Sequence, residues 1–307
     1  MEYVLQAFSL TKKYKDNWAL SGVDISIEKG DIYGFVGENG SGKTTVIRVI
    51  TGLISPNGGK FELFGVSSDK PEIIEARKRI GAIVETPSIY HNFSAYDNLK
   101  MQSTIIGIND DSRIKSVLCE VGLSELYDSK KSAGNFSLGM RQRLGIAMAL
   151  LAEPEFIILD EPMNGLDPAG IVEIRELILK LNREKGITFL ISSHILTELA
   201  LVATKYGIIS KGKIIKEITA KELRDECRQS VILEVDKPDL LLSTVSSFIP
   251  KEDISLASSG LKIYGSVSLN QLFDEINKAG ITILSVNSQK ASIEDYYLAT
   301  IGGNHNA

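Results

Sequence analysis

Short apolar runs alternate with longer segments of helical periodicity from residue 1 to about residue 217. Four runs rich in β-forming residues predict buried strands: DIYGFVG (31–37), FIILD (156–160), ITFLIS (187–192) and YGIIS (206–210). Such near-continuous apolar strands are typical of a parallel sheet covered on both faces. Between them, a helical pattern is present in KTTVIRVITGL, RQRLGIAMALL and IVEIRELILKLNREKG. The alternation predicts an α/β domain with crossover connections.

Two further segments depart from this alternation. Residues from about 94 to 150 are mostly helical and contain no clear strand run, which predicts a helical subdomain inserted into the sheet domain. After residue 217 the pattern becomes strand, helix, strand, strand, helix, strand, followed by a last helix, SIEDYYLATI. That order is typical of a small ferredoxin-like α+β unit. We therefore predict two domains, 1–217 and 218–307.

Composition agrees with this division and narrows the class of protein. The chain has 307 residues, and a domain usually takes about 150. Its formal net charge of −5 argues against a broad nucleic-acid-binding face, so we expect no nucleic-acid partner. Cys119 and Cys227 are far apart and lack metal-binding spacing, which indicates reduced thiols in a cytoplasmic protein.

Neither the first residues nor the apolar runs predict membrane insertion. The segment MEYVLQAFSL has no basic region followed by an apolar core, so we expect no signal peptide. The longest uncharged apolar run, LGIAMALLA, is far shorter than the roughly 18 residues that span a bilayer. If the protein works at a membrane, another chain supplies the membrane part.

The segment GFVGENGSGKTT follows a predicted strand and opens a predicted helix. It fits the pattern G-x-x-x-x-G-K-[ST], in which backbone N–H groups and the helix N-terminus converge on phosphate oxygens. The lysine neutralises the β- and γ-phosphates of a nucleotide, and the hydroxyl that follows it ligates Mg²⁺. The expected nucleotide-binding residues are Gly37, Asn39, Gly40, Ser41, Gly42, Lys43, Thr44 and Thr45.

Two acids and a histidine are expected beside this loop. Asp160 ends the FIILD strand, at the strand end where open α/β sheets bind ligands, and would hold Mg²⁺ mostly through water. Glu161 would polarise the attacking water, although two acids at a solvated strand end are the simpler alternative. His194 follows another apolar strand and is placed to contact the γ-phosphate and that water. The remaining histidines, His91 and His305, are interpreted as structural.

In their order along the chain, these motifs resemble the ATP-binding subunit of an ATP-binding cassette (ABC) transporter over residues 1–217. FSLGMRQR is similar to the family signature, with Ser137 and Gly139 matching and two neighbours departing from it. NGLD resembles the family's D-loop and ends in Asp167, while His194 resembles its switch histidine. Tyr14 resembles the aromatic residue that stacks on adenine, with surface packing as the alternative.

The resemblance implies Mg²⁺-dependent ATP hydrolysis by a homodimer that sandwiches two ATP molecules, each held against Ser137 of the other protomer. It also implies permease subunits in the membrane and a peripheral position on its cytoplasmic face. A heterodimer and a soluble ATPase acting on nucleic acid or ribosomes are the alternatives. The C-terminal unit is expected to support the dimer or to regulate it.

One acidic residue, Glu85, narrows the resemblance to a subgroup of this family. Glu85 stands where most relatives have a glutamine that ligates Mg²⁺, and Ser94 and Asp97 form a capping-box pattern that places a loop over 85–93. A glutamate there resembles the subgroup that expels bacitracin-like and lantibiotic peptides, and we expect it to act as a Mg²⁺ ligand and in catalysis. A neutral replacement in an exporter of another drug is the alternative. Nearby aromatic side chains line a groove for the permease or pack inside the subdomain: Tyr90, Phe93 and Tyr96.

Overall fold

A computed structural model describes residues 2–227, 230–250, 253–257, 260–264, 268–289 and 292–302. The chain divides into two compact units, Met1–Ala220 and Lys221–Ala307. The predicted boundary after residue 217 falls inside strand β10 (Lys213–Thr219), so the units divide after Ala220 instead. Among the described residues, no helix is long and apolar enough to cross a bilayer. His305 lies outside the described residues.

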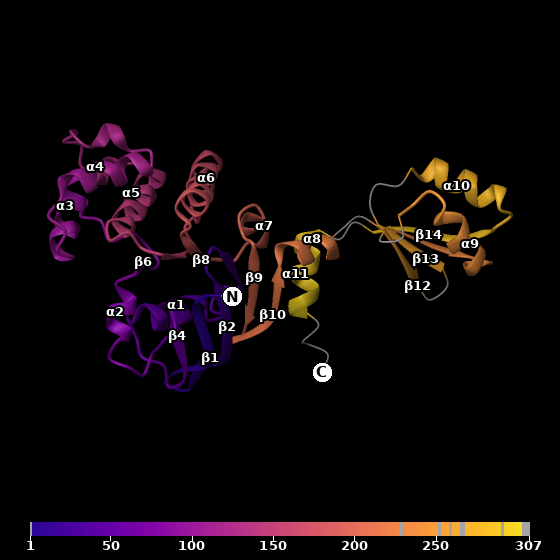
Figure 1. Cartoon of the computed structure of the whole chain (residues 1–307), viewed down its shortest axis with the longest axis horizontal. Helices are drawn as coiled ribbons and strands as arrows, with labels where there is room; N and C mark the ends of the chain where they lie inside the picture. The colour runs from indigo at the N-terminus through magenta and orange to yellow at the C-terminus, as the bar shows by residue number, and fades with distance from the viewer. Residues whose placement is uncertain are drawn as a thin grey trace. The chain divides into compact units, whose positions relative to one another are not determined.

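The first unit is organised around a six-stranded sheet of order β10-β9-β3-β8-β7-β6, which is parallel except for β10 (Figure 1). Its remaining strands are β3 (Ile32–Val36), β6 (Ile80–Ile83), β7 (Phe156–Asp160), β8 (Thr188–Ser193) and β9 (Lys205–Ser210). All four strands predicted for this unit are confirmed, as β3, β7, β8 and β9. Strands β3, β7 and β8 are buried along their whole length, because the sheet is covered on both faces.

A second, antiparallel sheet of order β2-β1-β4-β5 was not predicted. It consists of β1 (Tyr3–Tyr14), β2 (Asn17–Glu28), β4 (Gly58–Leu63) and β5 (Val66–Ser67). The pairing of β1 with β2 has several register shifts, so the alternation of buried and exposed residues is broken. The usual period-2 signal is therefore weak in the sequence. Both sheets contribute to one core, together with the apolar face of α1 (Lys43–Thr51).

The predicted helical subdomain is confirmed as α3 (Ala95–Ile105), α4 (Asp111–Glu120) and α5 (Leu138–Leu150), which Figure 1 shows as a separate group of helices. Ser94 and Asp97 form the expected capping box at the start of α3. The remaining helices of this unit are α2 (Ile73–Arg77), α6 (Pro168–Lys185) and α7 (Leu196–Leu199).

Two ion pairs join the helical subdomain to α6. The Nζ of Lys185 lies 2.7 Å from Glu120 of α4, and Arg143 of α5 lies 3.4 Å from Glu173. On its other side, α5 packs closely on the loop after β6. A Cβ on Gly145 would lie 2.6 Å from Cβ of Pro87, so only glycine allows this approach.

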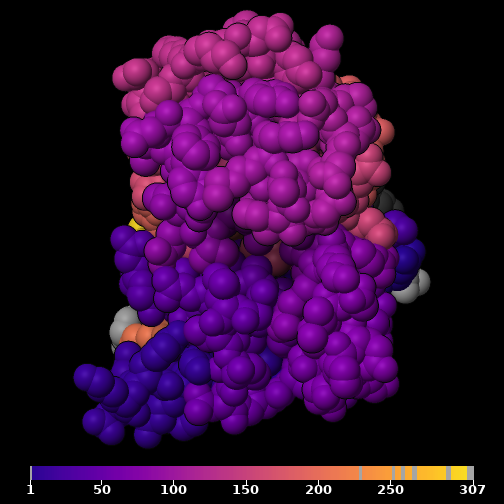
Figure 2. Space-filling view, turned by 90° about the vertical axis from the view of Figure 1, so that its left-hand side faces the viewer, coloured from indigo at the N-terminus to yellow at the C-terminus, as the bar shows by residue number. Residues whose placement is uncertain are grey.

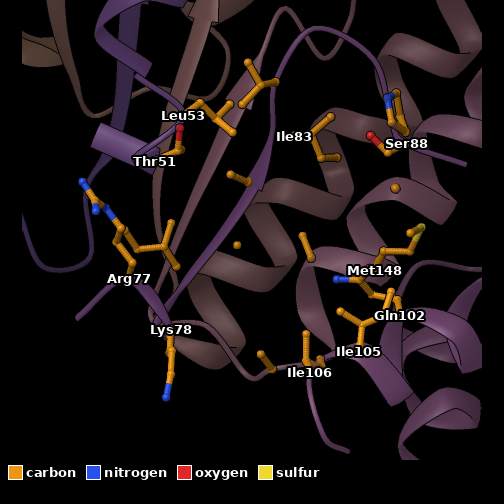
Figure 3. Close-up of a pocket in the computed structure, with 18 of the residues that line it drawn as sticks. Thr51, Leu53, Arg77, Lys78, Ile83, Ser88, Gln102, Ile105, Ile106 and Met148 are labelled. Carbon is orange, nitrogen blue, oxygen red and sulfur yellow. The ribbon is translucent and has the colours of Figure 1, made fainter. Parts of the chain in front are cut away.

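The face shown in Figure 2 is hollowed between the helical subdomain above and the sheet core below. A cavity of about 770 Å³ opens there. One wall carries Leu53 and Arg77, and the opposite wall carries Gln102, Ile105 and Met148 from α3 and α5 (Figure 3). Leu53 and Ile105 are largely exposed, so the cavity has apolar walls that no described residue covers.

The second unit has a four-stranded antiparallel sheet of order β12-β13-β11-β14. Helix α8 (Ala220–Glu226) begins at the last residue of the first unit. The elements that follow it are β11 (Ser230–Val235), α9 (Pro238–Val245), β12 (Ile254–Ala257), β13 (Gly260–Tyr264), α10 (Leu269–Lys278), β14 (Ile283–Gln289) and α11 (Ile293–Gly302). Leu241 of α9 and Leu272 of α10 pack against Leu233 and Leu261 of the sheet. From β11 to β14 the elements follow the expected strand–helix–strand–strand–helix–strand order.

The contact between Gly145 and Pro87 predicts that Gly145→Ala destabilises the protein by about 1–3 kcal/mol, because the methyl group overpacks α5 against the loop. Urea unfolding of the full chain measures this. Gly139→Ala is the matched control on the same helix, since its Cβ would meet its nearest neighbour at 3.9 Å. Equal stabilisation of both variants by the better helix propensity of alanine would contradict the packing argument.

Candidate functional site

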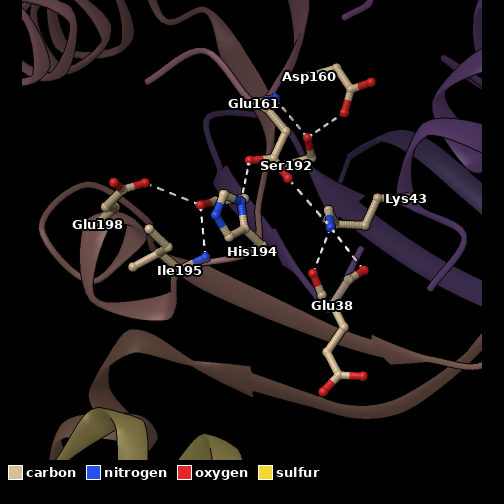
Figure 4. Close-up of polar contacts among 10 residues, drawn as sticks. Glu38, Lys43, Asp160, Glu161, Ser192, His194, Ile195 and Glu198 are labelled. Carbon is tan, nitrogen blue, oxygen red and sulfur yellow. Dashed lines mark hydrogen bonds and ion pairs between the residues drawn. The ribbon is translucent and has the colours of Figure 1, made fainter. Parts of the chain in front are cut away.

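The loop between β3 and α1 carries the predicted phosphate site. Lys43 is buried, and its Nζ donates hydrogen bonds to the carbonyl oxygens of Gly37 at 2.5 Å and Glu38 at 3.2 Å (Figure 4). Asn39 and Gly40 are exposed at the tip of the loop. The ammonium group is thus held inside the loop, at the N-terminus of α1, where anionic phosphate oxygens are favoured.

Two glycines of this loop are required by its close packing. A Cβ on Gly37 would lie 2.4 Å from the carbonyl oxygen of Ile209, and Gly42 has a φ of 116°. A side chain at Gly42 would also approach the carbonyl oxygen of Ala19 in β2 at 2.8 Å. The loop therefore presents its backbone without side chains in the way, which is what phosphate binding needs.

Asp160 and Glu161 lie at the carboxyl end of β7 and are held by Ser192 of β8. The Ser192 hydroxyl donates to Oδ1 of Asp160 at 2.6 Å and accepts a hydrogen bond from the backbone N–H of Glu161 at 2.9 Å (Figure 4). Parallel pairing sets Asp160 opposite Ser192. One buried hydroxyl thereby orients both acids.

Glu161 is the centre of a network that joins three strand ends. Its Oε1 lies 3.4 Å from Nζ of Lys43, and its Oε2 lies 2.8 Å from Nδ1 of His194 (Figure 4). Its backbone is in the left-handed region with a φ of 51°, which is costly for a residue other than glycine and is characteristic of functional sites. The sequence predicts that His194 contacts the γ-phosphate and the attacking water. In the structure, the His194 ring contacts the Glu161 carboxylate.

The residues present fit a nucleotide with Mg²⁺. Oδ2 of Asp160 and Oγ of Ser41 are buried and have no hydrogen-bond partner among the described residues. Thr44, at the first turn of α1, and Asp160 both line a cavity of about 490 Å³. Within the described part of the chain, no three acidic, His or Cys side chains gather into a metal site of their own. Mg²⁺ is typically bound by one or two carboxylates together with substrate phosphates.

Ser137, Gly139 and Asp167 lie at two exposed helix starts. Ser137 caps α5 and accepts from the N–H of Met140 at 3.2 Å, and Asp167 caps α6 and accepts from the N–H of Gly170 at 2.9 Å. Gly139 lies against Gly170, so the two helix starts are close together. Both capping residues are exposed, with free faces for a further ligand.

Glu85 lines the same cavity as Thr44 and Asp160. Its carboxylate forms an ion pair with Arg48 of α1, which the sequence analysis did not consider. Thr45 is half-buried in the first turn of the same helix.

Tyr14 lies at the exposed end of β1, where Nζ of Lys12 is 5.5 Å from the centre of its ring. Its role in stacking on adenine stays a prediction. Tyr90 and Phe93 are exposed and stack at 5.3 Å, whereas Tyr96 packs edge-on against Tyr127.

The sequence analysis did not identify two residues of the site, Ser192 and Arg48. Ser192 was hidden inside the apolar strand FLISS, where a serine gives no motif signal, although its position opposite Asp160 follows once the strands are paired in parallel. Arg48 follows Thr44 by one helical turn, and that spacing was the available signal.

The first unit therefore has the architecture and the phosphate loop of a P-loop ATPase. A family model described as "ABC transporter" matches residues 20–164. The chain is 41% identical, over 99% of both chains, to the bacitracin transport ATP-binding protein BcrA of Bacillus licheniformis. It is also 41% identical to the lantibiotic transport ATP-binding protein SrtF of Streptococcus pyogenes, over 75% of this chain and 98% of that protein.

A solved structure supports the same relationship. It is cbiO1 from Clostridium perfringens, part of the ABC transporter complex cbiONQ, which aligns with a TM-score of 0.67 and 27% identity over 74% of this chain and 92% of its own. The chain belongs to the ABC transporter family, and its first unit is the ATP-binding, ATP-hydrolysing domain.

The position of Ser192 predicts that Ser192→Ala lowers kcat for ATP more than it changes KM, because both acids lose their common hydrogen-bond partner. The free energy of unfolding should also fall by about 1–3 kcal/mol, since a buried carboxylate oxygen and N–H are left unpaired. Steady-state ATPase assays and urea unfolding measure the two effects.

Ser193→Ala is the matched control. The neighbouring hydroxyl is also buried but bonds to Ile195 and Glu198, away from the two acids. If both variants had the same kcat, Ser192 would be a packing residue only.

Proposed function

We propose that this chain is the ATP-binding and ATP-hydrolysing subunit of an ABC exporter that expels a bacitracin-like or lantibiotic peptide antibiotic through separate permease subunits. The observation that carries the enzymatic part is the network around Glu161, which joins the phosphate-loop lysine and the histidine after β8. The relatives support the substrate class.

In this proposal Glu161 is the general base that accepts a proton from the attacking water. His194 orients the Glu161 carboxylate through its Nδ1, and its remaining ring nitrogen is available to the γ-phosphate or the water. Lys43 leaves the loop carbonyl oxygens and Glu161 to neutralise the phosphates as ATP enters. Positioning and charge neutralisation are the main requirements of phosphoryl transfer.

Thr44 and Asp160 would hold Mg²⁺, with Oδ2 of Asp160 as the oxygen that faces it, because Oδ1 is committed to Ser192. When bound, Mg²⁺ neutralises charge that develops on the phosphate oxygens. Glu85 is the further acid at this position, since it lines the same cavity.

The exposed helix starts support a homodimer with two composite sites. Ser137 and Asp167 cap α5 and α6 at the surface, where the N–H groups of α5 and the Ser137 hydroxyl are accessible to the γ-phosphate held by a second copy. One chain carries both complementary half-sites, so two identical subunits suffice. ATP binding closes this dimer, and hydrolysis with product release reopens it.

The substrate class rests on the extent of similarity. The bacitracin transport protein matches the whole chain, including the second unit, whereas the lantibiotic transport protein matches 75% of it with nearly its full length. A bacitracin-like peptide is therefore favoured. The second unit is an accessory that supports the dimer or regulates it.

The permease is proposed to dock in the cavity between the helical subdomain and the sheet core. Its walls present exposed apolar side chains from both sides, among them Leu53 and Ile105, which suit a cytoplasmic helix of a membrane partner (Figure 3). Tyr90 and Phe93 lie outside the lining of this cavity, so they are not its main anchors. The subunit is then peripheral on the cytoplasmic face of the membrane.

The assignment of the base predicts that Glu161→Gln lowers kcat by at least about 100-fold while ATP binding is retained. Gel filtration with Mg²⁺ and ATP should then show a trapped dimer, because hydrolysis no longer reopens it. Substantial turnover by Glu161→Gln would remove Glu161 from the role of base.

The transport proposal predicts that cells without this chain become sensitive to bacitracin-like peptides and that the intact chain restores protection. Ile105→Glu should bind and hydrolyse ATP but fail to protect, because a charge in the cavity wall blocks docking. Inhibitory concentrations of bacitracin, a lantibiotic and unrelated drugs are measured in the complemented strains.

Ile74→Glu is the matched control, because Ile74 is similarly exposed at 62%, against 68% for Ile105, and lies outside the cavity lining. If cells without this chain became sensitive only to unrelated drugs, the proposed substrate class would be wrong. Unchanged sensitivity to every compound, with the protein absent from membrane fractions, would favour an ATPase that is not coupled to transport.

A further inference from the structure

The carboxylate of Glu85 and the guanidinium of Arg48 form an ion pair between the loop after β6 and helix α1. Both side chains are accessible, at 59% for Glu85 and 38% for Arg48. Glu85 has a φ of 65°, in the left-handed region, so the loop holds it in a conformation that a glutamate adopts at a cost. Glu85 is thus paired with Arg48 while it stays open to solvent.

This pair lies at the edge of the nucleotide cavity. Glu85, Thr44, Asp160 and Glu161 all contribute to its lining. Arg48 follows Thr44 by four residues on α1, so the two side chains lie on one face of the helix, one turn apart. The guanidinium is therefore close to the residues that would hold the metal but is not part of the cavity lining.

The three acids of the site have different partners. Glu161 contacts Lys43 and His194, and Asp160 is held by the Ser192 hydroxyl. Glu85 has Arg48. Arg48 compensates the negative charge of the Glu85 carboxylate as long as no metal cation is bound beside it.

We propose that Arg48 is a positioning residue that competes with Mg²⁺ for the Glu85 carboxylate, so that Glu85 is paired with Arg48 before the nucleotide binds and turns to the metal position afterwards. This deepens the proposed function and rests on its Mg²⁺-dependent ATP binding. The exposure of the pair keeps the competition balanced, because an accessible ion pair contributes only a small free energy and is readily exchanged. A buried pair would lock Glu85 in one position.

The test measures binding of a fluorescent ATP analogue to the full chain as Mg²⁺ is titrated. Arg48→Gln frees Glu85, so the Mg²⁺ concentration for half-maximal binding should fall about two- to fivefold, which is the range expected for an exposed ion pair. Arg48→Lys should restore the value of the unaltered chain. In a Glu85→Gln background, Arg48→Gln should no longer lower this concentration, because the competing carboxylate is absent.

Lys100→Gln is the matched control. It removes the ion pair between Nζ of Lys100 and Oδ1 of Asp111 in the helical subdomain, which are 2.6 Å apart and comparably exposed. This variant should leave the Mg²⁺ requirement unchanged. Arg48 also lies in the last turn of α1, where a cation stabilises the helix. If Arg48→Gln lowers the melting temperature without changing the Mg²⁺ requirement, or lowers that requirement equally in the Glu85→Gln background, the proposal is overturned. Absence of Mg²⁺-dependent ATP binding by the unaltered chain would instead refute the proposed function.

Discussion

Parallel pairing of β3, β8 and β7 is the constraint on which the site depends. The carboxyl ends of these strands meet at one edge of the sheet, so the phosphate loop after β3, the acids after β7 and His194 after β8 come together. Glu161 then contacts both Lys43 and His194, although the three residues are far apart along the chain. Each strand is buried throughout, which leaves little freedom for a shift in register.

The site combines rigid and exchangeable contacts. Ser192 is fully buried and holds Asp160 through a buried hydrogen bond and Glu161 through a partly buried one. Arg48 and Glu85, in contrast, pair at the surface, on an α-helix and a loop. Buried hydrogen bonds to charged groups are strong, and exposed ion pairs are weak. The chain thus places strong contacts at the hydrolytic centre and a weak contact at the loop that leads to the helical subdomain.

That loop connects the ATP site with the proposed permease site. Glu85 lines the nucleotide cavity, and Pro87, two residues later, packs on Gly145 of α5. The larger cavity is bounded by this loop, by the end of α3 and by α5. A movement of Glu85 can therefore be transmitted through the contact of Pro87 with Gly145 to the apolar cavity walls. Ion pairs such as Lys185–Glu120 hold the helical subdomain to α6.

The sequence alone was sufficient for the central strands, the helical subdomain and the phosphate loop, because buried parallel strands and glycine-rich loops impose strong local patterns. It placed Asp160 and Glu161 at the end of a buried strand, where the structure has them, whereas their roles stay predictions. It also predicted the start of α3 from Ser94 and Asp97. Only the tertiary structure decided that Ser192 orients both acids and that Arg48 pairs with Glu85, because these partners come from different elements and neither belongs to a local motif. The antiparallel sheet escaped prediction for a related reason: register shifts between β1 and β2 erase the period of two that a sequence displays.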